Sequence, residues 1–303
     1  MNLGYACINM ELNARKGDDR VTTNRTMIKK TFHDKGVDYA SELIIQNVVD
    51  LSKIIDWNEQ NNIKFFRLSS EMFPWASEYY QDWDSVPHID FIKMWLENAG
   101  LKAKEYGHRI TSHPGPFNVL VSPNENVVQN TITDLTIHAD IFDMMGLSRT
   151  PYNKLNIHCN GVYGDKQSAM DRFCKNFERL PESVQTRLTV ENDDKASMYS
   201  VKDLYEGIHK RIGIPIVFDY HHYKFNTGGQ TEQEALEMAL STWGDITPVV
   251  HYSESRSIEQ LDESIKPQAH SDLIKELPNT YGNDVDIMVE AKHKELAIEG
   301  FIK

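Results

Sequence analysis

The sequence predicts an α/β fold, in which eight parallel strands and their crossover helices close into a single (β/α)8 barrel. Two observations predict it. Short apolar runs alternate with longer amphipathic segments along all 303 residues, and most of the apolar runs end in a His, Asp or Glu. In a parallel barrel the carboxyl ends of all strands open onto one face. Side chains at those ends therefore converge, even where 28 to 45 residues separate them in sequence.

The predicted strands follow one another at intervals long enough for a crossover helix. In chain order they are Asn2–Ile8, Ile63–Leu68, Arg109–His113, Lys154–His158, Arg187–Glu191, Ile214–Asp219, Pro248–His251 and Val285–Glu290. A doubly wound sheet would instead predict a glycine-rich phosphate turn after the first strand. Gly4-Tyr-Ala-Cys7 stands there, so the barrel is favoured.

Amphipathic helices are predicted in every gap between the strands. The first has Ile44, Val48, Leu51 and Ile55 on one face, at spacings of 4, 3 and 4. Phe91, Met94, Trp95 and Leu101 indicate the next helix, and Ile132, Leu135, Ala139 and Phe142 make another amphipathic face. No repeat or Pro/Gly-rich linker divides the chain, so we expect residues 1–303 to form a single TIM-barrel domain.

The composition indicates a globular protein without membrane contact. No apolar run reaches 18 residues and no basic-plus-apolar leader is evident. Three widely spaced cysteines favour a reducing setting. We therefore expect an intracellular protein, in the cytoplasm or nucleoid, or in the nucleus of a eukaryote. The net charge of −13 argues mildly against nucleic acid as a partner. Bound divalent cations would weaken that argument, because they add positive charge that no residue count includes.

Side chains of metal-binding type gather at the predicted strand ends and in one loop. They are His113, His158, Glu191, Asp219, His222, His251, His270 and Glu290. A single His is more often a packed core residue, but three converging carboxylates would repel one another without a counter-ion. Five imidazoles and three carboxylates exceed one tetrahedral site. They suit two or three ions bridged by Glu191 or Glu290, and favour Mn²⁺ or Zn²⁺ over Ca²⁺ or Mg²⁺. A metal-free acid–base cleft is the alternative.

Clustered ions can hydrolyse a phosphodiester or isomerise a sugar, and composition does not separate the two. Basic residues in the predicted upper loops favour phosphate. They are Arg15, Lys16, Arg20, Arg25, Lys29 and Lys30 after the first strand, and Lys292 and Lys294 after the last. The alternative for such a stretch is a solvated basic surface. Tyr5, Trp75 and Phe117 fall at strand ends or in these loops, where aromatic rings can stack on bases.

Several longer motifs match a known family. They include Asn24-Arg-Thr, Asp56-Trp-Asn58, Phe66-Arg-Leu-Ser-Ser70, Phe73-Pro74, His113-Pro-Gly115, Val190-Glu-Asn-Asp193, Trp243, His251-Tyr-Ser253 and Met288-Val-Glu-Ala-Lys-His-Lys-Glu295. In this order, from Leu3 to Glu295, the chain resembles the UV damage endonuclease family. The resemblance implies a TIM barrel related to endonuclease IV, with a cluster of divalent ions that is often manganese.

The resemblance also implies an activity and a set of site residues. The family nicks DNA immediately 5′ of UV photoproducts, cyclobutane dimers and 6-4 photoproducts, and leaves a 3′-hydroxyl. The implied partner is damaged double-stranded DNA, and no protein partner is indicated. The eight residues above match the family's metal ligands, and we assign catalytic roles to Glu191, Glu290 and His251. Tyr5 and Asn9 match positions beside the damaged nucleotides.

Two positions depart from some relatives. Gln-Tyr follows His-Pro-Gly there and wedges into the duplex, whereas Pro116 and Phe117 stand here, so the aromatic wedge is kept without the amide. A lysine that can be modified precedes the strand-seven His by two residues there, whereas this chain has Val249. The alternatives to a photoproduct endonuclease are an abasic-site endonuclease, a metal-dependent sugar isomerase or epimerase, and a non-catalytic damage-binding protein.

Overall fold

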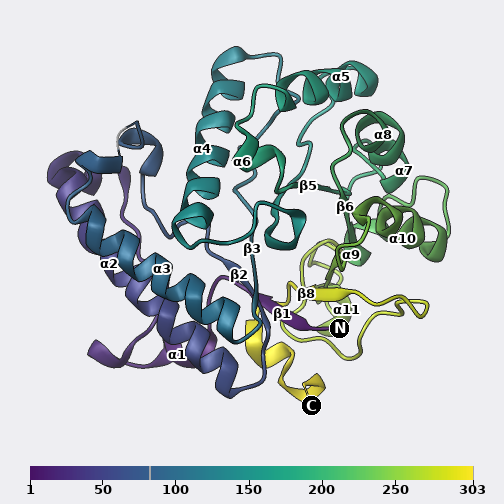
Figure 1. The fold of residues 1–303 in the computed structure, drawn as a ribbon. Helices are drawn as coiled ribbons and strands as arrows, with labels where there is room; N and C mark the ends of the chain where they lie inside the picture. The colour runs from purple at the N-terminus through teal and green to yellow at the C-terminus, as the bar shows by residue number, and fades with distance from the viewer. Residues whose placement is uncertain (82, 303) are drawn as a thin grey trace.

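Eight short parallel strands form a closed barrel in the computed structural model, which describes residues 1–81 and 83–302 (Figure 1). Each strand pairs with the next in chain order, and the last pairs with the first. The strands are β1 (Leu3–Ala6), β2 (Phe65–Leu68), β3 (Arg109–Ser112), β4 (Leu155–Ile157), β5 (Leu188–Glu191), β6 (Ile216–Asp219), β7 (Val249–Tyr252) and β8 (Asp286–Val289). This confirms the predicted (β/α)8 fold, with strand ends within two residues of those expected from the carboxyl-terminal polar residues.

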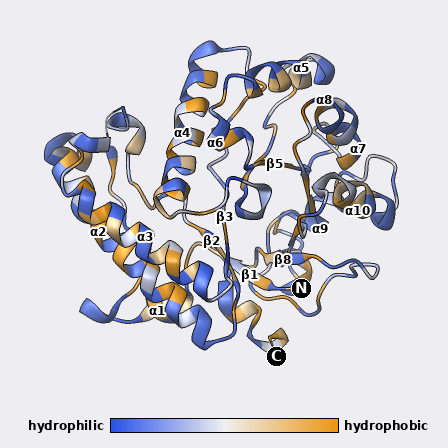
Figure 2. Ribbon diagram, in the orientation of Figure 1, coloured by the Kyte–Doolittle hydropathy of each residue, from blue (hydrophilic) through white to orange (hydrophobic). Residues whose placement is uncertain are grey.

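The helices surround the barrel and turn their apolar faces towards it (Figure 2). They are α1 (Met10–Ala14), α2 (Lys29–Gln60), α3 (Ile89–Glu105), α4 (Glu125–Met144), α5 (Lys166–Phe177), α6 (Glu182–Gln185), α7 (Val201–Leu204), α8 (Lys210–Ile212), α9 (Tyr220–Tyr223), α10 (Glu232–Leu240) and α11 (Arg256–Glu259). No helix within the described ranges is both long and apolar enough to cross a membrane.

The helix expected in every gap is wrong for the last crossover. Between β7 and β8 the chain forms only the one-turn α11, followed by about 25 residues of irregular chain. Pro267 and Pro278 interrupt this segment, which limits any longer helix because proline lacks a donor N–H.

The helix indicated by Phe91, Met94, Trp95 and Leu101 is present as α3, but most of these residues lie on its outer side. Phe91, Met94 and Leu101 are 43%, 51% and 57% exposed, and the buried face instead includes Leu96, Ala99, Gly100 and Ala103. Both series have helical spacing, and close packing decides between them. A Cβ on Gly100 would lie 1.7 Å from the carbonyl oxygen of Met145, so only the small residues fit against the neighbouring chain. The face of α2 predicted around Ile44 is buried as expected.

Alternation along the strands places the candidate ligands inside the barrel. Residues two apart on a strand point to the same side. On β8, Asp286 lies at the floor, Met288 in an apolar middle layer with Phe65 and Val249, and Glu290 at the mouth just past the strand end. The same spacing turns the other strand-end polar residues inwards, so the barrel itself builds the site.

A buried ion pair closes the floor of the barrel. Arg109 Nη1 lies 3.0 Å from Asp286 Oδ2, and neither side chain is more than 4% exposed. Arg109 also donates to the backbone oxygens of Tyr152 and Thr247, and Asp286 accepts from the backbone N–H of Asn2. The pair therefore ties β3, β8 and the amino end of β1 together.

This floor generates a stability prediction. Asp286→Ala leaves the guanidinium of Arg109 buried without a counter-charge, which should destabilise the fold by about 3–5 kcal/mol in chemical denaturation. Asp284→Ala is the control, since that carboxylate is 79% exposed and pairs with the chain's amino terminus. It should change stability by no more than about 0.5 kcal/mol. Equal effects of the two substitutions would show that the buried Arg109–Asp286 pair contributes no more to stability than the exposed pair of Asp284.

Candidate metal centre

The predicted metal-binding residues converge at the mouth of the barrel. Glu191 and Asp219 end β5 and β6, and His251 lies in β7. His113, His158 and Glu290 directly follow β3, β4 and β8. Six consecutive strands therefore each supply one side chain, as the strand-end pattern predicts.

Glu191 lies at the centre of this group. Two sets of three side chains have ligand atoms within 4.8 Å of one another, His113 with His158 and Glu191, and Glu191 with Asp219 and His251. Glu191 belongs to both sets and is fully buried. Its Oε2 lies 3.3 Å from His113 Nε2 and 3.0 Å from His251 Nδ1. A carboxylate shared by two ligand sets is the geometry expected of a bridging ligand.

The other predicted ligands lie directly beside these two sets. His222 Nδ1 is 3.4 Å from Glu191 Oε1, and Glu290 Oε1 is 3.3 Å from His251 Nδ1. The ring of His270 lies 6.3 Å from that of His222, and its Nδ1 is 2.7 Å from Ser253 Oγ. His270 thus extends the group outwards from the loop after β7. The structure therefore brings all eight residues to one place.

Unpartnered carboxylate oxygens show that the group fits cations. Glu191 Oε1 and Asp219 Oδ2 are buried and have no hydrogen-bond partner within the described residues. Burying such an oxygen without a partner is unfavourable. Burial alone would raise the pKa of Glu191, but the imidazoles of His251 and His158 outweigh it and hold the pKa well below its usual range. Glu191 therefore stays an anion that can bridge two cations.

The neighbouring groups show how the negative charge is shared. Burial, together with the negative charges of Glu191 and Glu290, raises the pKa of Asp219 to about 7. Burial works in the opposite direction on His158, but the charges of Glu191 and Asp193 outweigh it and raise its pKa to about 9. The raised pKa values mean that Asp219 binds a proton more readily than a free carboxyl and that His158 holds its proton more tightly than a free imidazole. Divalent cations would supply the same compensation without protons.

The structure adds polar residues that the sequence reading missed. Asn156 donates to Glu191 Oε2, and Arg67 forms an ion pair with Glu290. Lys154 Nζ lies 3.2 Å from His251 Nε2, and burial lowers the pKa of Lys154 to about 7. The sequence could have indicated two of them, because Lys154 and Asn156 precede His158 at intervals of two and so face the same side of β4.

Tyr5 and Asn9, which are expected beside the damaged nucleotides, are buried in a hydrogen-bond network. Both are buried, the Tyr5 hydroxyl donates to Asn58 Oδ1 at 2.7 Å, and Asn9 Nδ2 donates to that hydroxyl at 3.0 Å. The cause is strand alternation: Gly4 and Ala6 face the barrel interior, so Tyr5 between them faces helix α2. The contact with damaged nucleotides stays a prediction, and it would require both side chains to leave this network.

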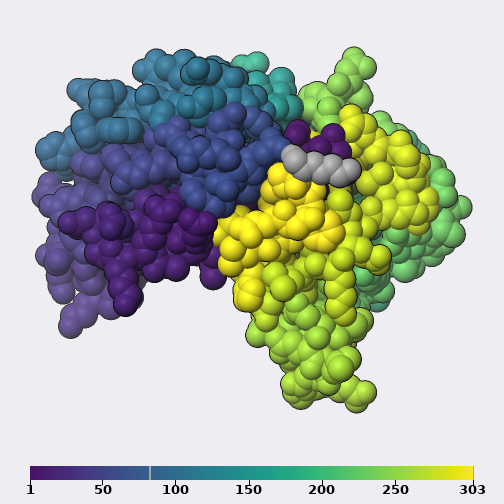
Figure 3. Space-filling view, turned by 90° about the horizontal axis from the view of Figure 1, so that it is seen from below, coloured from purple at the N-terminus to yellow at the C-terminus, as the bar shows by residue number. Residues whose placement is uncertain are grey.

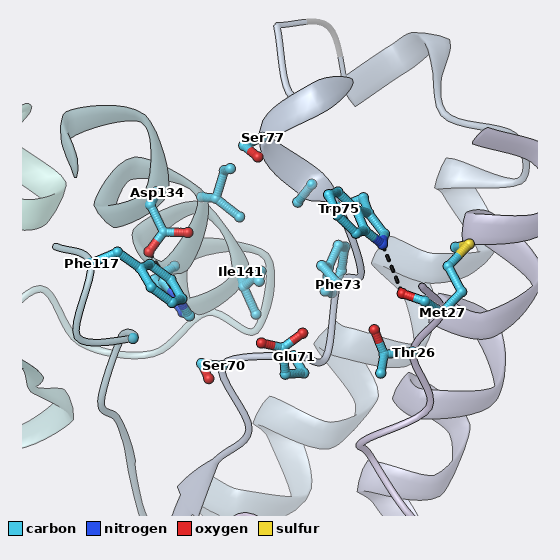
Figure 4. Close-up of a pocket in the computed structure, with 14 residues that line it drawn as sticks. Thr26, Met27, Ser70, Glu71, Phe73, Trp75, Ser77, Phe117, Asp134 and Ile141 are labelled. Atoms are coloured by element: carbon cyan, nitrogen blue, oxygen red, sulfur yellow. Dashed lines mark hydrogen bonds and ion pairs between the residues drawn. The ribbon is translucent and has the colours of Figure 1, made fainter. Parts of the chain in front are cut away.

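Phe117 lies on an open surface beside a cavity of about 300 Å³ (Figure 4). Its side chain is 68% exposed and leans over Gly115, where a Cβ would come within 2.5 Å of the ring. Phe73 and Trp75 line the same cavity, and the Trp75 indole donates to the carbonyl oxygen of Met27. Pro116 precedes Phe117 in the same exposed loop. The ring is therefore free to contact a partner.

Two raised segments flank the mouth of the barrel. Figure 3 shows the chain around residues 10–30, in purple, and the segment between β7 and β8, in yellow-green, on two sides of a hollow, with the last residues in yellow between them. Within the described residues, the exposed side chains of Lys16, Lys29 and Lys30 have no ion pair, whereas Arg15 pairs with Glu11 and Arg25 with Asp50. The first loop thus offers free cations on one side of the hollow.

Comparisons with known proteins agree with this architecture. The sequence profile of the family described as UV-endonuclease UvdE matches residues 1–303. A UV-damage endonuclease of Schizosaccharomyces pombe is 38% identical over 98% of this chain, which spans about half of that protein's length (49%). A UV DNA damage endonuclease of Bacillus cereus is 33% identical over 91% of this chain and 86% of its own. The crystal structure of SacUVDE matches with a TM-score of 0.84 at 31% identity, covering 100% of this chain and 96% of that one.

The position of Glu191 in both ligand sets predicts a metal-dependent stability. At a Mn²⁺ concentration 100 times the dissociation constant, binding should stabilise the native protein by about 2.7 kcal/mol. Glu191→Gln keeps the size of the side chain but loses the bridging charge, so bound metal and this gain should both be lost. Metal content by mass spectrometry and melting with Mn²⁺ or chelator measure the effect.

Asp194→Asn is the matched control, because it neutralises a carboxylate three residues away that belongs to neither ligand set. Its metal content should match that of the unsubstituted protein. Full metal content in Glu191→Gln would show that Glu191 is not the bridge.

Proposed function

The chain belongs to the UV-endonuclease UvdE family, and from this we propose that it is a metal-dependent DNA endonuclease that nicks the backbone immediately 5′ of UV photoproducts. The proposed lesions are cyclobutane dimers and 6-4 photoproducts, and the product carries a 3′-hydroxyl. The observation that carries the proposal is the buried Glu191 shared by two sets of ligands at the open end of the barrel.

The proposed catalytic centre assigns each group a task. His113 and His158 would hold one ion with Glu191, and Asp219 and His251 would hold another. Glu290, His222 and His270 lie beside these sets and would complete a third position. Two or three divalent ions, Mn²⁺ or Zn²⁺, would lower the pKa of an attacking water and offset the charge of a phosphodiester. Glu191, Glu290 and His251 are the residues we propose as catalytic.

The supporting residues fix the orientation of these ligands. Asn156 holds one oxygen of Glu191, and Arg67 holds one oxygen of Glu290. Asp193 Oδ1 lies 3.1 Å from His158 Nδ1, which directs the opposite nitrogen towards Glu191. Such partners keep the rings and carboxylates in place before the substrate arrives.

The proposed substrate is double-stranded DNA that contains a lesion. A photoproduct is poorly stacked, so exposing it costs less than exposing normal bases, and this difference provides selectivity. The exposed Phe117 lies in the loop after β3 and could occupy the gap left by displaced bases. Lys16, Lys29 and Lys30 could contact phosphates beside the hollow. The names of the relatives, which specify UV damage, support the same substrate.

The first functional prediction concerns cleavage. With Mn²⁺ the protein should nick UV-irradiated supercoiled plasmid and leave untreated plasmid intact, and chelator should stop the reaction. Glu191→Gln should nick at least about 10³-fold more slowly, as expected for loss of a major electrostatic element. Gel analysis of a duplex with one placed photoproduct gives the position of the nick.

The other candidate functions give different results in the same assays. Cleavage only at abasic sites would indicate the abasic-site endonuclease. Binding of damaged DNA without any nick would indicate the damage-binding protein. Conversion of an aldose to a ketose without DNA cleavage would indicate the sugar isomerase.

The second functional prediction concerns Phe117. If its ring enters the gap at the lesion, Phe117→Ala should weaken binding to damaged duplex by about 1–3 kcal/mol. Binding to undamaged duplex, metal content and melting temperature should stay unchanged, because the side chain is 68% exposed. Pro116→Gln should strengthen damaged-duplex binding or broaden the lesion range, since an amide can pair with unpartnered bases.

Phe91→Ala is the control for the loss of an exposed phenylalanine, since Phe91 is 43% exposed on the outer face of α3. It should change neither affinity. An unchanged ratio of damaged to undamaged affinity in Phe117→Ala would rule out the wedge, and a lower melting temperature would indicate a packing role.

A further inference from the structure

One side of the barrel mouth carries cations in place of metal-binding residues. The candidate ligands come from β3 to β8 and the loop after β7. The remaining two strands contribute Cys7, just after β1, and Arg67 on β2. Arg67 pairs with Glu290, and its Nε is buried without a hydrogen-bond partner among the described residues. Positive charge thus borders the ligand group at the β1–β2 side.

Lys294 adds a second cation to this side. It begins the 3-10 helix η7 (Lys294–Ala297), which follows β8 and packs against β1 and α1. Its backbone has a φ of 54°, in the left-handed region that residues with a Cβ rarely adopt. Cys7 has the same feature, with a φ of 70°. The Cys7 N–H donates to the carbonyl oxygen of Arg67 at 2.8 Å, and η7 packs against β1, so both strained backbones lie on this side of the barrel. Strain of this kind gathers at functional sites.

The neighbouring Glu295 holds Lys294 in this position. Glu295 is fully buried, and its Oε1 accepts from the backbone N–H of Glu11 at 2.8 Å in the first turn of α1. The N–H of Lys294 donates to the carbonyl oxygen of Ala291 at 3.2 Å. The chain on both sides of Lys294 is thus fixed, which gives its backbone little freedom to leave the left-handed conformation.

The ammonium of Lys294 has no partner in the described part of the chain. No ion pair and no side-chain hydrogen bond involve it, although the residue is only partly exposed. Burial lowers the pKa of Lys294, and Cys7, Arg67, Glu290 and Glu295 are near enough for their charges to act on it. An unpaired, partly buried cation is unfavourable unless an anion from outside completes it.

We propose that Lys294 is a substrate-binding residue, which together with Arg67 binds the non-bridging oxygens of the phosphate that is cleaved. The inference rests on the proposed function and deepens it. A phosphodiester bound at the candidate ligand group would present its remaining oxygens to the β1–β2 side, which contributes no candidate ligand. Arg67 is already engaged by Glu290, so Lys294 is the free cation there.

The test compares four variants on a duplex with one photoproduct. Lys294→Gln should lower kcat/KM by about 10- to 100-fold, as expected for loss of a charged hydrogen bond, with most of the loss in kcat. Lys294→Arg should retain most of the activity. Lys294→Gly removes the charge and the strain together, so it should lose as much activity as Lys294→Gln while melting at the same or a higher temperature. Lys266→Gln, which removes an exposed lysine between β7 and β8, should leave kcat unchanged.

Binding to the same duplex in chelator provides a readout without turnover. For Lys294→Gln, the slope of log affinity against log salt should fall by about one phosphate contact. Metal content should stay at the level of the unsubstituted protein. These results would support direct contact with the phosphate.

Three results would overturn the proposal while the unsubstituted protein nicks irradiated DNA. One is normal kcat/KM in Lys294→Gln. Another is loss of metal or melting temperature in parallel with activity, which would indicate a structural role. The third is a stable Lys294→Gly with normal activity, which would show that the left-handed backbone is only a loop conformation. Failure of the unsubstituted protein to nick irradiated DNA would instead remove the proposed function.

Discussion

The concentration of negative charge at the barrel mouth is the constraint on which the rest of the site depends. Glu191 is fully buried, and Asp219 and Glu290 lie in the same group. Carboxylates rarely occupy such positions unless cations or strong donors surround them. The imidazoles, Asn156, Arg67 and Lys154 are arranged around this charge. Buried polar residues thus surround this charge at the mouth of the barrel, where divalent cations would complete the balance.

The barrel makes this concentration possible because its interior is divided into layers. On β8 a charged floor residue, an apolar middle residue and a charged mouth residue, Asp286, Met288 and Glu290, follow one another at intervals of two. The apolar layer around Phe65, Val249 and Met288 separates the two charged layers. Val249, in place of a lysine, keeps that layer apolar directly below His251. Lys154, which directly precedes β4 across the barrel, supplies the amine that contacts His251.

The sequence predicted the barrel, its strands and the convergence of eight polar residues, because strand-end position follows from local pattern. The sequence did not show features that depend on packing between residues far apart in the chain. Which side of α3 is buried depends on the close approach of Gly100 to Met145, and the spacing of apolar residues in the sequence does not reveal that contact. The burial of Tyr5 follows from which way β1 faces, and Gly4, without a side chain, gave no sign of it. Arg67 was visible in a motif, but its partner Glu290 lies 223 residues away.

The way the two ends of the chain meet has a consequence for how the protein is made. Asn2 bonds to Asp286, Glu11 bonds to Glu295, and β1 pairs with β8, so each of these links spans more than 280 residues. During synthesis β1 has only one of its two neighbours until β8 has left the ribosome. The mouth of the barrel cannot assemble before then, because Glu290 and Lys294 follow the other candidate ligands along the chain. Until then the free edge of β1 has unpaired backbone groups. Such edges are prone to pair with the wrong strand and are recognised by chaperones.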